Sequence, residues 1–352
     1  MVQSKSLVFN AIPDGFPVPG KDLVVKSSEI DITKAPEGGV VLKVLLVSID
    51  PYMRGRMRDS SIKSYSPAYP IGQAIEGGGI AKIIESSHAT LKQGDIVTGL
   101  ITHSEYAVYS AERTAASNLK VVNNPYKFPL ERFTGVLGMP GLTAYASLYD
   151  IGELHKNEKE TIFVSAASGA VGSLVGQLAK REGLRVVGSA GSDEKVKYLT
   201  EKLGFDVAFN YKTESPKDAL AKYIPEGLDI YYDNVGGETL EAAIENAKPF
   251  ARFIESGMIS QYNRKAGEDA YPIKNLMHVV TKRLKIQGFI VGDIAGKYIA
   301  DFYKNVGQWL HEGSIHYSED VTVGIDNEAE GFVNMLKGGN FGKAVIRYAD
   351  DE

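Results

Sequence analysis

The chain begins with short apolar segments that are separated by glycine-rich turns. Apolar and β-branched residues concentrate at 40–48, 80–84, 96–99 and 105–109, and glycines such as 77–79 stand between them. Short strands joined by close turns are typical of a small barrel or sandwich. The pattern therefore predicts a β-rich domain in the first third of the chain.

From about residue 128 the pattern changes to an alternation of strands and helices. Short apolar segments predict strands at 161–166, 184–189, 207–209, 228–232, 252–256 and 285–291. Helical spacing of apolar residues, with Ser192 as one N-cap, predicts helices at 142–149, 170–183, 193–203, 238–247 and 298–312. This succession requires a parallel sheet with helices on both faces. The strand-like ends of 317–348 indicate a return of the chain to the first domain.

The segment 166–172 (A-A-S-G-A-V-G) joins the first predicted strand of this region to a helix. Gly169 lets the backbone come close to a pyrophosphate, and Gly172 lets the helix pack tightly on the strand. The helix N-terminus attracts an anion. A tight turn without a ligand is the alternative. The strand–turn–helix context favours a dinucleotide site at Gly169, Ala170, Val171 and Gly172.

The end of the second strand bears on the choice of nicotinamide cofactor. Enzymes that use NAD carry an acidic residue there, whereas this chain has Gly-Ser-Ala-Gly-Ser at 188–192. Lys195 opens the next helix, and Tyr211-Lys212 end the following strand. Small residues leave room for a 2′-phosphate, and the cations Lys195 and Lys212 supply charge for it, so we predict NADP(H). A solvated helix residue is the alternative for Lys195. The adjacent Asp193-Glu194 pair weakens this inference, although both residues suit a helix N-terminus.

The composition excludes several kinds of chemistry. The sequence has no cysteine, which excludes disulfides and thiolate zinc sites, and its six histidines form no helical pair, so we predict no metal. A net charge of −5 argues against a nucleic-acid partner. No apolar run is long enough to cross a membrane, and residues 1–10 lack the apolar core of a signal peptide. We therefore expect a cytoplasmic protein.

Five further segments occur in a recognisable order. They are 48–54 (SIDPYMR), 138–145 (GMPGLTAY), 233–238 (DNVGGE), 256–263 (SGMISQYN) and 339–343 (GNFGK). Together with the segment 166–172 (the glycine loop) they resemble the zinc-independent branch of the medium-chain dehydrogenase/reductase superfamily. Within it the chain is similar to the family of prostaglandin reductases, leukotriene hydroxydehydrogenases and plant alkenal double-bond reductases. Zinc members carry Gly-His-Glu where this chain has Gly72-Gln73-Ala74, which removes a histidine ligand.

The resemblance implies an α/β protein with two domains. Residues 1–127 and 313–352 would form a GroES-like β-rich domain, and residues 128–312 a Rossmann domain with a doubly wound parallel sheet. The implied activity is NADPH-dependent reduction of the C=C bond of α,β-unsaturated aldehydes and ketones. The implied cofactor contacts are Gly169, Ala170, Val171, Gly172, Lys195, Tyr211, Asn234, Ser256, Gly257, Met258, Ile259, Ser260, Gln261, Tyr262, Phe289, Ile290, Val291 and Asn340. The resemblance also implies a homodimer, with 285–291 as a possible edge strand.

Two tyrosines are candidates for the catalytic and substrate-binding groups. Hydride transfer to the β-carbon of an enone leaves negative charge on the carbonyl oxygen, and a hydrogen-bond donor placed there lowers the barrier. Tyr262 follows a strand end and stays protonated at neutral pH, so it is the first candidate. A ribose hydroxyl or a water could donate instead. Tyr52 is the second candidate, and simple packing is the alternative for both residues.

Two other functions remain open. A quinone oxidoreductase of the same superfamily would use the same fold, cofactor and hydride. A regulatory protein could bind NADP without significant catalysis, because a fold does not determine an activity.

Overall fold

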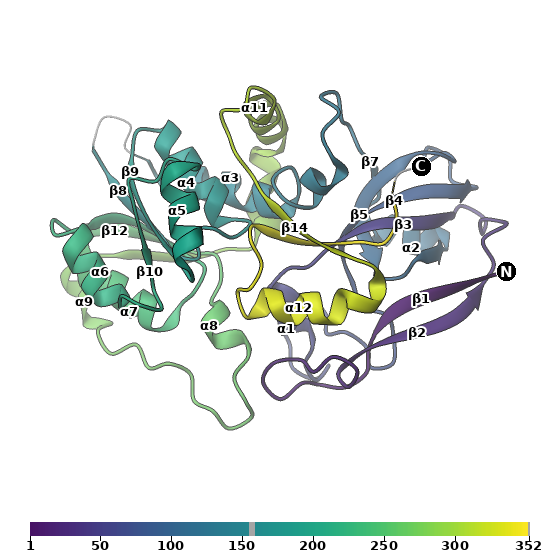
Figure 1. The fold of residues 1–352 in the computed structure, drawn as a ribbon, viewed down its shortest axis with the longest axis horizontal. Coiled ribbons are helices and arrows are strands. Elements are labelled where there is room, and N and C mark those ends of the chain that lie inside the picture. The colour runs from purple at the N-terminus through teal and green to yellow at the C-terminus, as the bar shows by residue number, and fades with distance from the viewer. Residues whose placement is uncertain (155–158, 351–352) are drawn as a thin grey trace. The chain divides into compact units, whose positions relative to one another are not determined.

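The computed structural model describes residues 1–154 and 159–350 and divides the chain into two compact units. Unit 1 contains Met1–Gly135 and Glu319–Glu352, and unit 2 contains Val136–Ser318 (Figure 1). These boundaries lie a few residues after the expected ones at 127/128 and 312/313. The reason is that the 3₁₀ helix η1 (Leu130–Thr134) packs against the first unit's sheet, which the chain rejoins at Glu319.

Unit 1 is built around antiparallel strands. In the described part of the chain its larger sheet has seven strands in the order β14-β15-β3-β4-β5-β7, with β6 paired to β3. They are β3 (Val40–Ser48), β4 (Glu76–Ser86), β5 (Ile96–Thr102), β6 (Tyr106–Tyr109), β7 (Lys120–Val121), β14 (Glu319–Val323) and β15 (Lys343–Arg347). A separate antiparallel pair consists of β1 (Val2–Phe9) and β2 (Leu23–Ile30). Short helices complete the unit: α1 (Tyr52–Arg56), α2 (Ala111–Ala116), η3 (Ile325–Asn327) and α12 (Glu328–Leu336).

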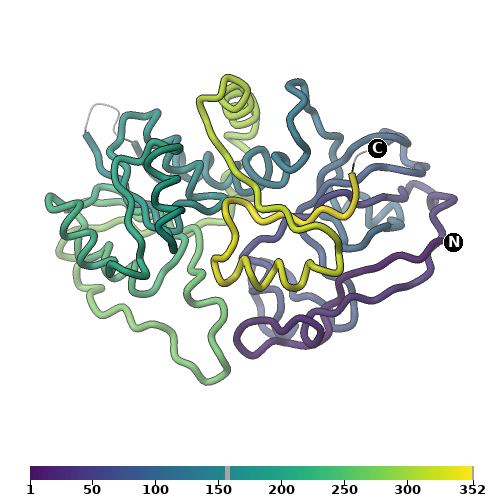
Figure 2. The backbone as a smooth tube through the Cα atoms, in the orientation of Figure 1, coloured from purple at the N-terminus to yellow at the C-terminus, as the bar shows by residue number. Residues whose placement is uncertain are grey.

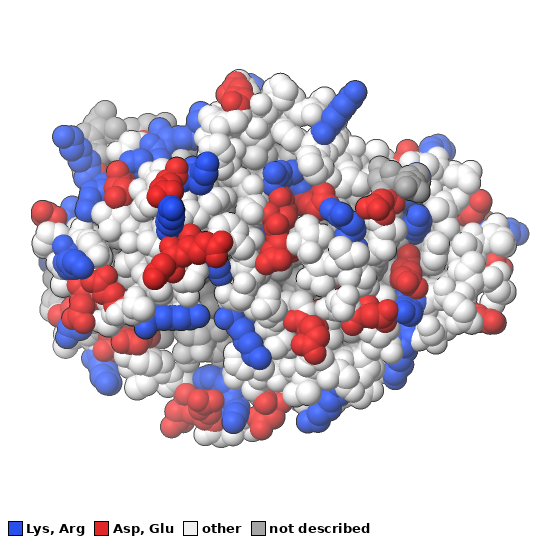
Figure 3. Space-filling view, in the orientation of Figure 1, with Lys and Arg blue, Asp and Glu red and all other residues white. Residues whose placement is uncertain are grey.

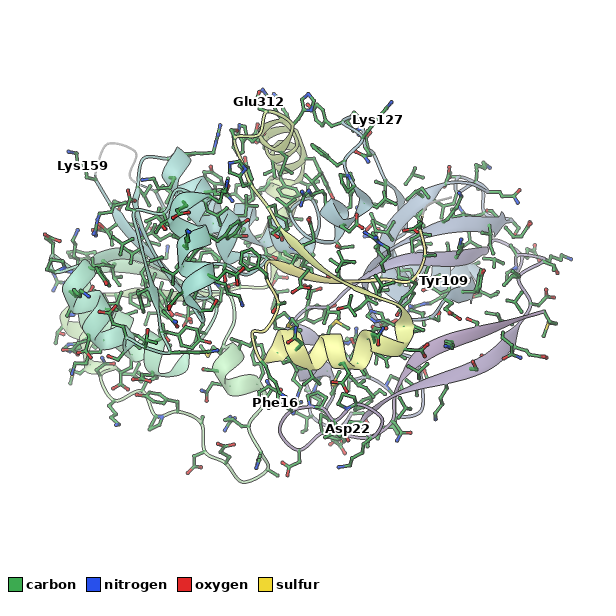
Figure 4. The ribbon with its side chains drawn as sticks, viewed as in Figure 1. Phe16, Asp22, Tyr109, Lys127, Lys159 and Glu312 are labelled. Carbon is green, nitrogen blue, oxygen red and sulfur yellow. The ribbon has the colours of Figure 1, made fainter. Side chains whose placement is uncertain are left out.

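Strand β3 is the centre of unit 1 because its apolar residues are buried on both faces. It pairs with β4 and β6 from its own region and with β15 from the chain's end. Polar side chains fix the surrounding turns. Asp22, labelled in Figure 4, accepts the Val18 N–H at 2.8 Å, and the Tyr109 hydroxyl accepts the Thr102 N–H at 2.8 Å.

Unit 2 contains a parallel sheet. Within the described residues it has six strands in the order β10-β9-β8-β11-β12-β13. They are β8 (Thr161–Val164), β9 (Arg185–Ala190), β10 (Val207–Asn210), β11 (Leu228–Asp233), β12 (Ala247–Glu255) and β13 (Lys285–Gly288). The helices are α3 (Met139–Ile151), α4 (Gly172–Arg181), α5 (Asp193–Glu201), α6 (Pro216–Tyr223), α7 (Gly237–Asn246), α8 (Ile259–Tyr262), α9 (Met277–Thr281), α10 (Val291–Ile294), η2 (Ala295–Lys297) and α11 (Ile299–His311). The strand order reverses at β8, which is the doubly wound topology expected from the sequence.

Helices cover both faces of this sheet because successive strand residues alternate between the faces. On one face Phe163 stacks on Tyr231 at 5.1 Å, and both pack in a core with residues of α6 and α7. On the other face the Tyr232 hydroxyl bonds Ser147 Oγ of α3 at 2.8 Å. Between α8 and α9 the backbone forms a long loop, residues 263–276 (Figure 2).

Several predicted bounds differ from the observed ones; the strand predicted at 252–256, for example, begins at Ala247 and ends at Glu255. The strand predicted at 285–291 ends at Gly288, where its pairing with Glu255 of β12 ends, and α10 begins at Val291. The helix predicted from residue 170 begins at Gly172, because 165–171 form the preceding turn.

The surface mixes both charges. In Figure 3 lysines and arginines lie among aspartates and glutamates over the visible face. In the described ranges, every helix is too short or too polar to cross a membrane.

Candidate functional site

The glycine loop lies at the carboxyl end of β8, where the strand order reverses. Gly169 N donates to Ala166 O at 3.0 Å, which closes a tight turn, and Ala166 itself has a φ of 46°. A Cβ on Gly172 would lie 2.7 Å from Ala166 O and 2.8 Å from Ala167 Cα. Gly172 is therefore the residue that lets α4 begin directly against the loop. This is the geometry in which a helix N-terminus can accept a phosphate.

The end of β9 brings Lys195 and Tyr211 into one neighbourhood. Ser192 caps α5 by accepting the Lys195 N–H at 3.3 Å. A Cβ on Gly191 would lie 3.0 Å from the Tyr211 hydroxyl, so the tyrosine ring lies directly beside this turn. Asn210 Nδ2 donates to Asp193 Oδ1 at 2.8 Å. Asp193, one of the two acidic residues that weaken the prediction of NADP(H), therefore accepts a hydrogen bond from Asn210.

The loops that follow β11 and β12 are bonded to each other. Ile259 N donates to Asn234 O at 3.2 Å, and Ser260 Oγ donates to Val235 O at 2.6 Å. Asn234 also reaches the glycine-loop side, because its Nδ2 donates to Ser165 O at 2.8 Å. The predicted residues at 169–172, 234 and 256–262 therefore meet at one edge of the sheet.

Close contacts explain the two glycines after Asn234. Gly236 has a φ of 68° and Gly237 a φ of 57°, which side chains disfavour. A Cβ on Gly236 would lie 2.8 Å from Met258 Cγ, and one on Gly237 would lie 2.9 Å from Ser260 Oγ. The segment 233–238 thus accommodates the neighbouring loop.

Tyr262 ends α8 with its hydroxyl turned back toward its own loop. The oxygen accepts the Met258 N–H at 3.1 Å, and a Cβ on Gly257 would lie 3.0 Å from it. Burial raises the pKa of Tyr262 above its ordinary value, so the hydroxyl stays protonated at neutral pH. Because its oxygen accepts a bond here, its own proton is available for donation.

The remaining predicted residues of unit 2 follow β13. Phe289, Ile290 and Val291 lie after the last strand residue, Gly288, which neighbours Glu255 of β12. They therefore belong to the same edge of the sheet, next to the loop that carries Tyr262.

Tyr52 and Asn340 belong to unit 1. Tyr52 begins α1 and is packed against the unit's apolar core, and burial together with Asp50 raises the pKa of its hydroxyl. Asn340 Nδ2 donates to Gly342 O at 2.7 Å, within the turn that precedes β15. Its side chain thus shapes the turn of the GNFGK segment.

A buried ion pair anchors the backbone just before Tyr52. Lys343 Nζ lies 3.3 Å from Asp50 Oδ1 and donates to Ile49 O at 2.7 Å. Ser48 Oγ donates to the other Asp50 oxygen at 2.5 Å. Sequence reasoning did not assign Lys343 a role, although a lysine beside a run of buried apolar residues is a detectable signal.

Sequence reasoning also missed a pair of buried carboxyl groups. Asp233 and Glu255 end neighbouring strands and are in register. The available signal was an acidic residue at the end of an apolar strand, repeated in two adjacent strands. Among the residues that the structure describes, no group of three or more metal-ligating side chains gathers to hold a metal.

Comparison with known proteins covers both units. A family model described as the N-terminal domain of oxidoreductase matches residues 5–117, and one described as zinc-binding dehydrogenase matches residues 170–312. The chain is 51% identical over 353 residues to the NADP-dependent oxidoreductase RED1 of Cochliobolus heterostrophus, covering 99% of each chain. It is 41% identical over 351 residues to the NADP(+)-dependent 2-alkenal reductase of Nicotiana tabacum, covering 98% of this chain and 97% of the relative.

A solved structure agrees over nearly the full length. The crystal structure of CurA from Vibrio vulnificus in complex with NADPH matches with a TM-score of 0.89 and 34% sequence identity. The match covers 98% of this chain and 99% of that one.

Proposed function

The chain belongs to the zinc-independent medium-chain dehydrogenase/reductase family, and from this membership we propose that it reduces the C=C bond of α,β-unsaturated aldehydes and ketones with NADPH. The observation that carries the proposal is that three loops meet at one edge of the sheet. They are the glycine loop, the loop after β11 that begins at Asn234 (the Asn234 loop) and the Ser256–Tyr262 loop. Relatives named for NADP and for alkenal reduction match 99% and 98% of the chain.

The residues at this edge fit a dinucleotide with a 2′-phosphate. The close approach at Gly172 presents the N-terminus of α4, which suits the pyrophosphate. Ser192, Lys195 and Tyr211 surround the end of β9, where an enzyme that uses NAD would carry a carboxylate. Lys195 supplies positive charge for the extra phosphate. We therefore expect Lys195→Ala to weaken NADPH binding about tenfold or more, and NADH binding little.

When bound, NADPH supplies the hydride that is transferred to the β-carbon of the substrate. Tyr262 donates its hydroxyl proton in a hydrogen bond to the substrate carbonyl oxygen, where negative charge develops. The Met258 N–H, which bonds the same hydroxyl at 3.1 Å, orients it and stabilises it as a donor. Tyr52 contacts the substrate and orients its carbonyl. A proton from water then reaches the α-carbon and completes the saturated product. Neither tyrosine acts as a nucleophile in this reaction.

The first experiment measures NADPH oxidation with a 2-alkenal, an aryl enone and a quinone, each product being identified by mass spectrometry. Saturated aldehydes or ketones are the expected products. Hydroquinone as the only product would replace the proposal with quinone reduction. Tight NADPH binding without turnover of any compound would replace it with a regulatory binding role.

The second experiment tests Tyr262. Tyr262→Phe is expected to lower kcat by about 10²-fold while the Kd for NADPH changes little. Tyr303→Phe is the matched control, because Tyr303 is an exposed tyrosine of the same unit. Unchanged turnover of a good enone by Tyr262→Phe would remove this residue from the catalytic step.

A homodimer formed through β13 is part of the proposal. In the described chain β13 is the last strand of the sheet and bonds only β12, so its other backbone edge can accept a second copy. Ile286 is partly exposed on this strand. Light scattering is expected to give twice the chain's mass for the wild type and the monomer mass for Ile286→Lys. A wild-type monomer would contradict the dimer and leave the proposed reaction unaffected.

A further inference from the structure

Two carboxyl side chains meet where the candidate cofactor loops begin. Asp233 ends β11, Glu255 ends β12, and the two residues are partners in the parallel ladder. Partners in register on neighbouring strands lie about 4.8 Å apart and project from the same face of the sheet. Asp233 is fully buried, and both carboxyl oxygens of Glu255 are inaccessible to solvent.

The two carboxyls have different surroundings. Asp233 Oδ1 accepts the Val235 N–H at 2.7 Å, the Gly236 N–H at 2.8 Å and the Tyr231 hydroxyl at 2.7 Å. The other Asp233 oxygen and both oxygens of Glu255 receive no hydrogen bond from the rest of the described residues. Three donors stabilise an anion at Asp233, whereas nothing comparable stabilises one at Glu255.

Two buried carboxylates side by side would repel each other, and one proton held by the pair removes this repulsion. Burial and the neighbouring Asp233 raise the pKa of Glu255 to about 9. A neutral Glu255 needs an acceptor for its proton, and Asp233 Oδ2 is the carboxylate oxygen beside it. The titratable groups that face the pair are Tyr231 on β11 and Tyr262 on α8, and burial raises the pKa of both hydroxyls. From β13 the pair is faced by Gly288, which has no side chain.

Both cofactor loops depend on this point. The Asp233 backbone carbonyl accepts the Ser256 N–H at 2.9 Å and the Gly257 N–H at 3.1 Å. These hydrogen bonds connect the end of β11, before the Asn234 loop, to the first residues of the Ser256–Tyr262 loop. The Asp233 carboxylate shapes the turn after Asn234 through the Val235 and Gly236 N–H groups. A second negative charge beside it would push the two strand ends apart.

We propose that Glu255 is a positioning residue that remains protonated and donates to Asp233, joining the Asn234 loop to the Ser256–Tyr262 loop. The proposal rests on the proposed function in that these loops bind NADPH. Glu255 touches neither cofactor nor substrate in this role. Its loss of a proton in alkaline solution releases the loops and weakens NADPH binding.

The test compares NADPH affinity, measured by fluorescence titration from about pH 6.5 to about pH 10, in four proteins. In the wild type the Kd is expected to rise about fivefold or more over this range. Glu255→Gln keeps a neutral donor, so it is expected to match the wild type at neutral pH and to lack the Glu255-dependent part of the rise. Glu255→Val removes the donor and is expected to bind about fivefold more weakly at every pH. Glu226→Gln, at an exposed turn, should follow the wild type.

Two outcomes of the NADPH titrations overturn the inference. One is an alkaline rise of the same size in Glu255→Gln and in the wild type. The other is Glu255→Val binding NADPH like the wild type at neutral pH.

A second readout does not require NADPH. Infrared difference spectra of the wild type against Glu255→Gln, both without cofactor, should show the carbonyl stretch of a protonated carboxylic acid at neutral pH. Absence of this band overturns the inference, whereas failure of the wild type to bind NADPH at neutral pH contradicts the proposed function while the band is still present.

Discussion

Replacing Lys343 with methionine removes a fully buried charge from unit 1. Its ammonium group lies 3.3 Å from Asp50 Oδ1 and donates to Ile49 O at 2.7 Å and Ala344 O at 2.6 Å. Burial lowers the pKa of Lys343, and Asp50 opposes this shift by favouring the charged form. Methionine has nearly the same length and volume, so the substitution tests the charge and its hydrogen bonds rather than a cavity.

The expected loss of stability is large because Asp50 stays behind. Asp50 is buried, and without Lys343 its charge keeps, among the residues that the structure describes, only the Ser48 hydroxyl at 2.5 Å. Removing one partner of a buried ion pair costs about 3–5 kcal/mol, and this figure includes part of the cost of Ile49 O, which loses its donor. Ala344 O keeps the Ile49 N–H at 3.3 Å. For a unit of this size such a loss lowers the Tm by about 10 °C.

The assay is urea and thermal unfolding followed by circular dichroism, with Asp50→Asn and the double variant completing a cycle. Asp50→Asn combined with Lys343→Met is expected to be more stable than Lys343→Met alone, because no buried charge is left unpaired. A loss below about 1 kcal/mol for Lys343→Met would refute the reasoning, since it would mean that water reaches Asp50. Because Ile49 and Asp50 lie three and two residues before Tyr52, kcat/KM for an enone should also fall while NADPH affinity is kept.

Three further predictions follow from the geometry of unit 2. Gly172→Ala is expected to weaken NADPH binding at least tenfold, because its Cβ would lie 2.7 Å from Ala166 O. Gly292→Ala is the control, because a Cβ there would have no atom within 4 Å. Equal NADPH affinities of the two variants in a titration would contradict the close-approach argument. Ser192→Ala removes the cap of α5 and should destabilise the protein by about 1 kcal/mol in urea unfolding, an unchanged midpoint being the contrary result. Wild-type stability should fall between about pH 5 and about pH 9. The pKa of Glu255 is about 9 in the folded chain and ~4.3 in the unfolded chain. The folded chain therefore holds this proton more tightly, and the resulting stabilisation is lost as the pH rises through that window. Glu255→Gln should show a smaller fall, so parallel Tm-against-pH curves would count against the assignment.

The parallel sheet of unit 2 was the most predictable part of the fold. Strands such as β8 (Thr161–Val164) are buried on both faces, and continuous apolar runs of this kind stand out between helices with apolar spacing. The expected two-domain α/β class is confirmed by the observed sheets. The strand at 285–291 was predicted too long because pairing, not hydropathy, decides where an edge strand ends.

The missed elements of the fold have weaker patterns. Strand β2 (Leu23–Ile30) contains the polar run Lys26–Glu29, because this two-stranded pair exposes much of one face. Helix α12 (Glu328–Leu336) buries Glu328 at its start, which disguises its apolar side. Glu328 is satisfied there by His103 and Tyr348, partners that are distant in sequence.

The candidate site shows the same division between local and long-range information. The glycine loop could be recognised because its strand, turn and helix are consecutive in the sequence. Asp233 and Glu255 could not be paired in this way, because only the register of β11 against β12 makes them neighbours. Motif reasoning also selects residues that touch a ligand, whereas this pair lies at the strand ends from which the loops proposed to bind NADPH begin.

What marks such a pair is its energetic cost. A buried acid without a cation partner destabilises the folded chain, so its presence at the carboxyl edge of the sheet calls for a compensating role. Here the compensation is structural control: one shared proton joins two loops whose backbones already bond through Asp233, Asn234 and Val235. An apolar pair at these positions would be less costly, but it would leave the Val235 and Gly236 N–H groups without their common acceptor. The buried acids therefore destabilise the folded chain at the position where Asp233 also holds the turn after Asn234.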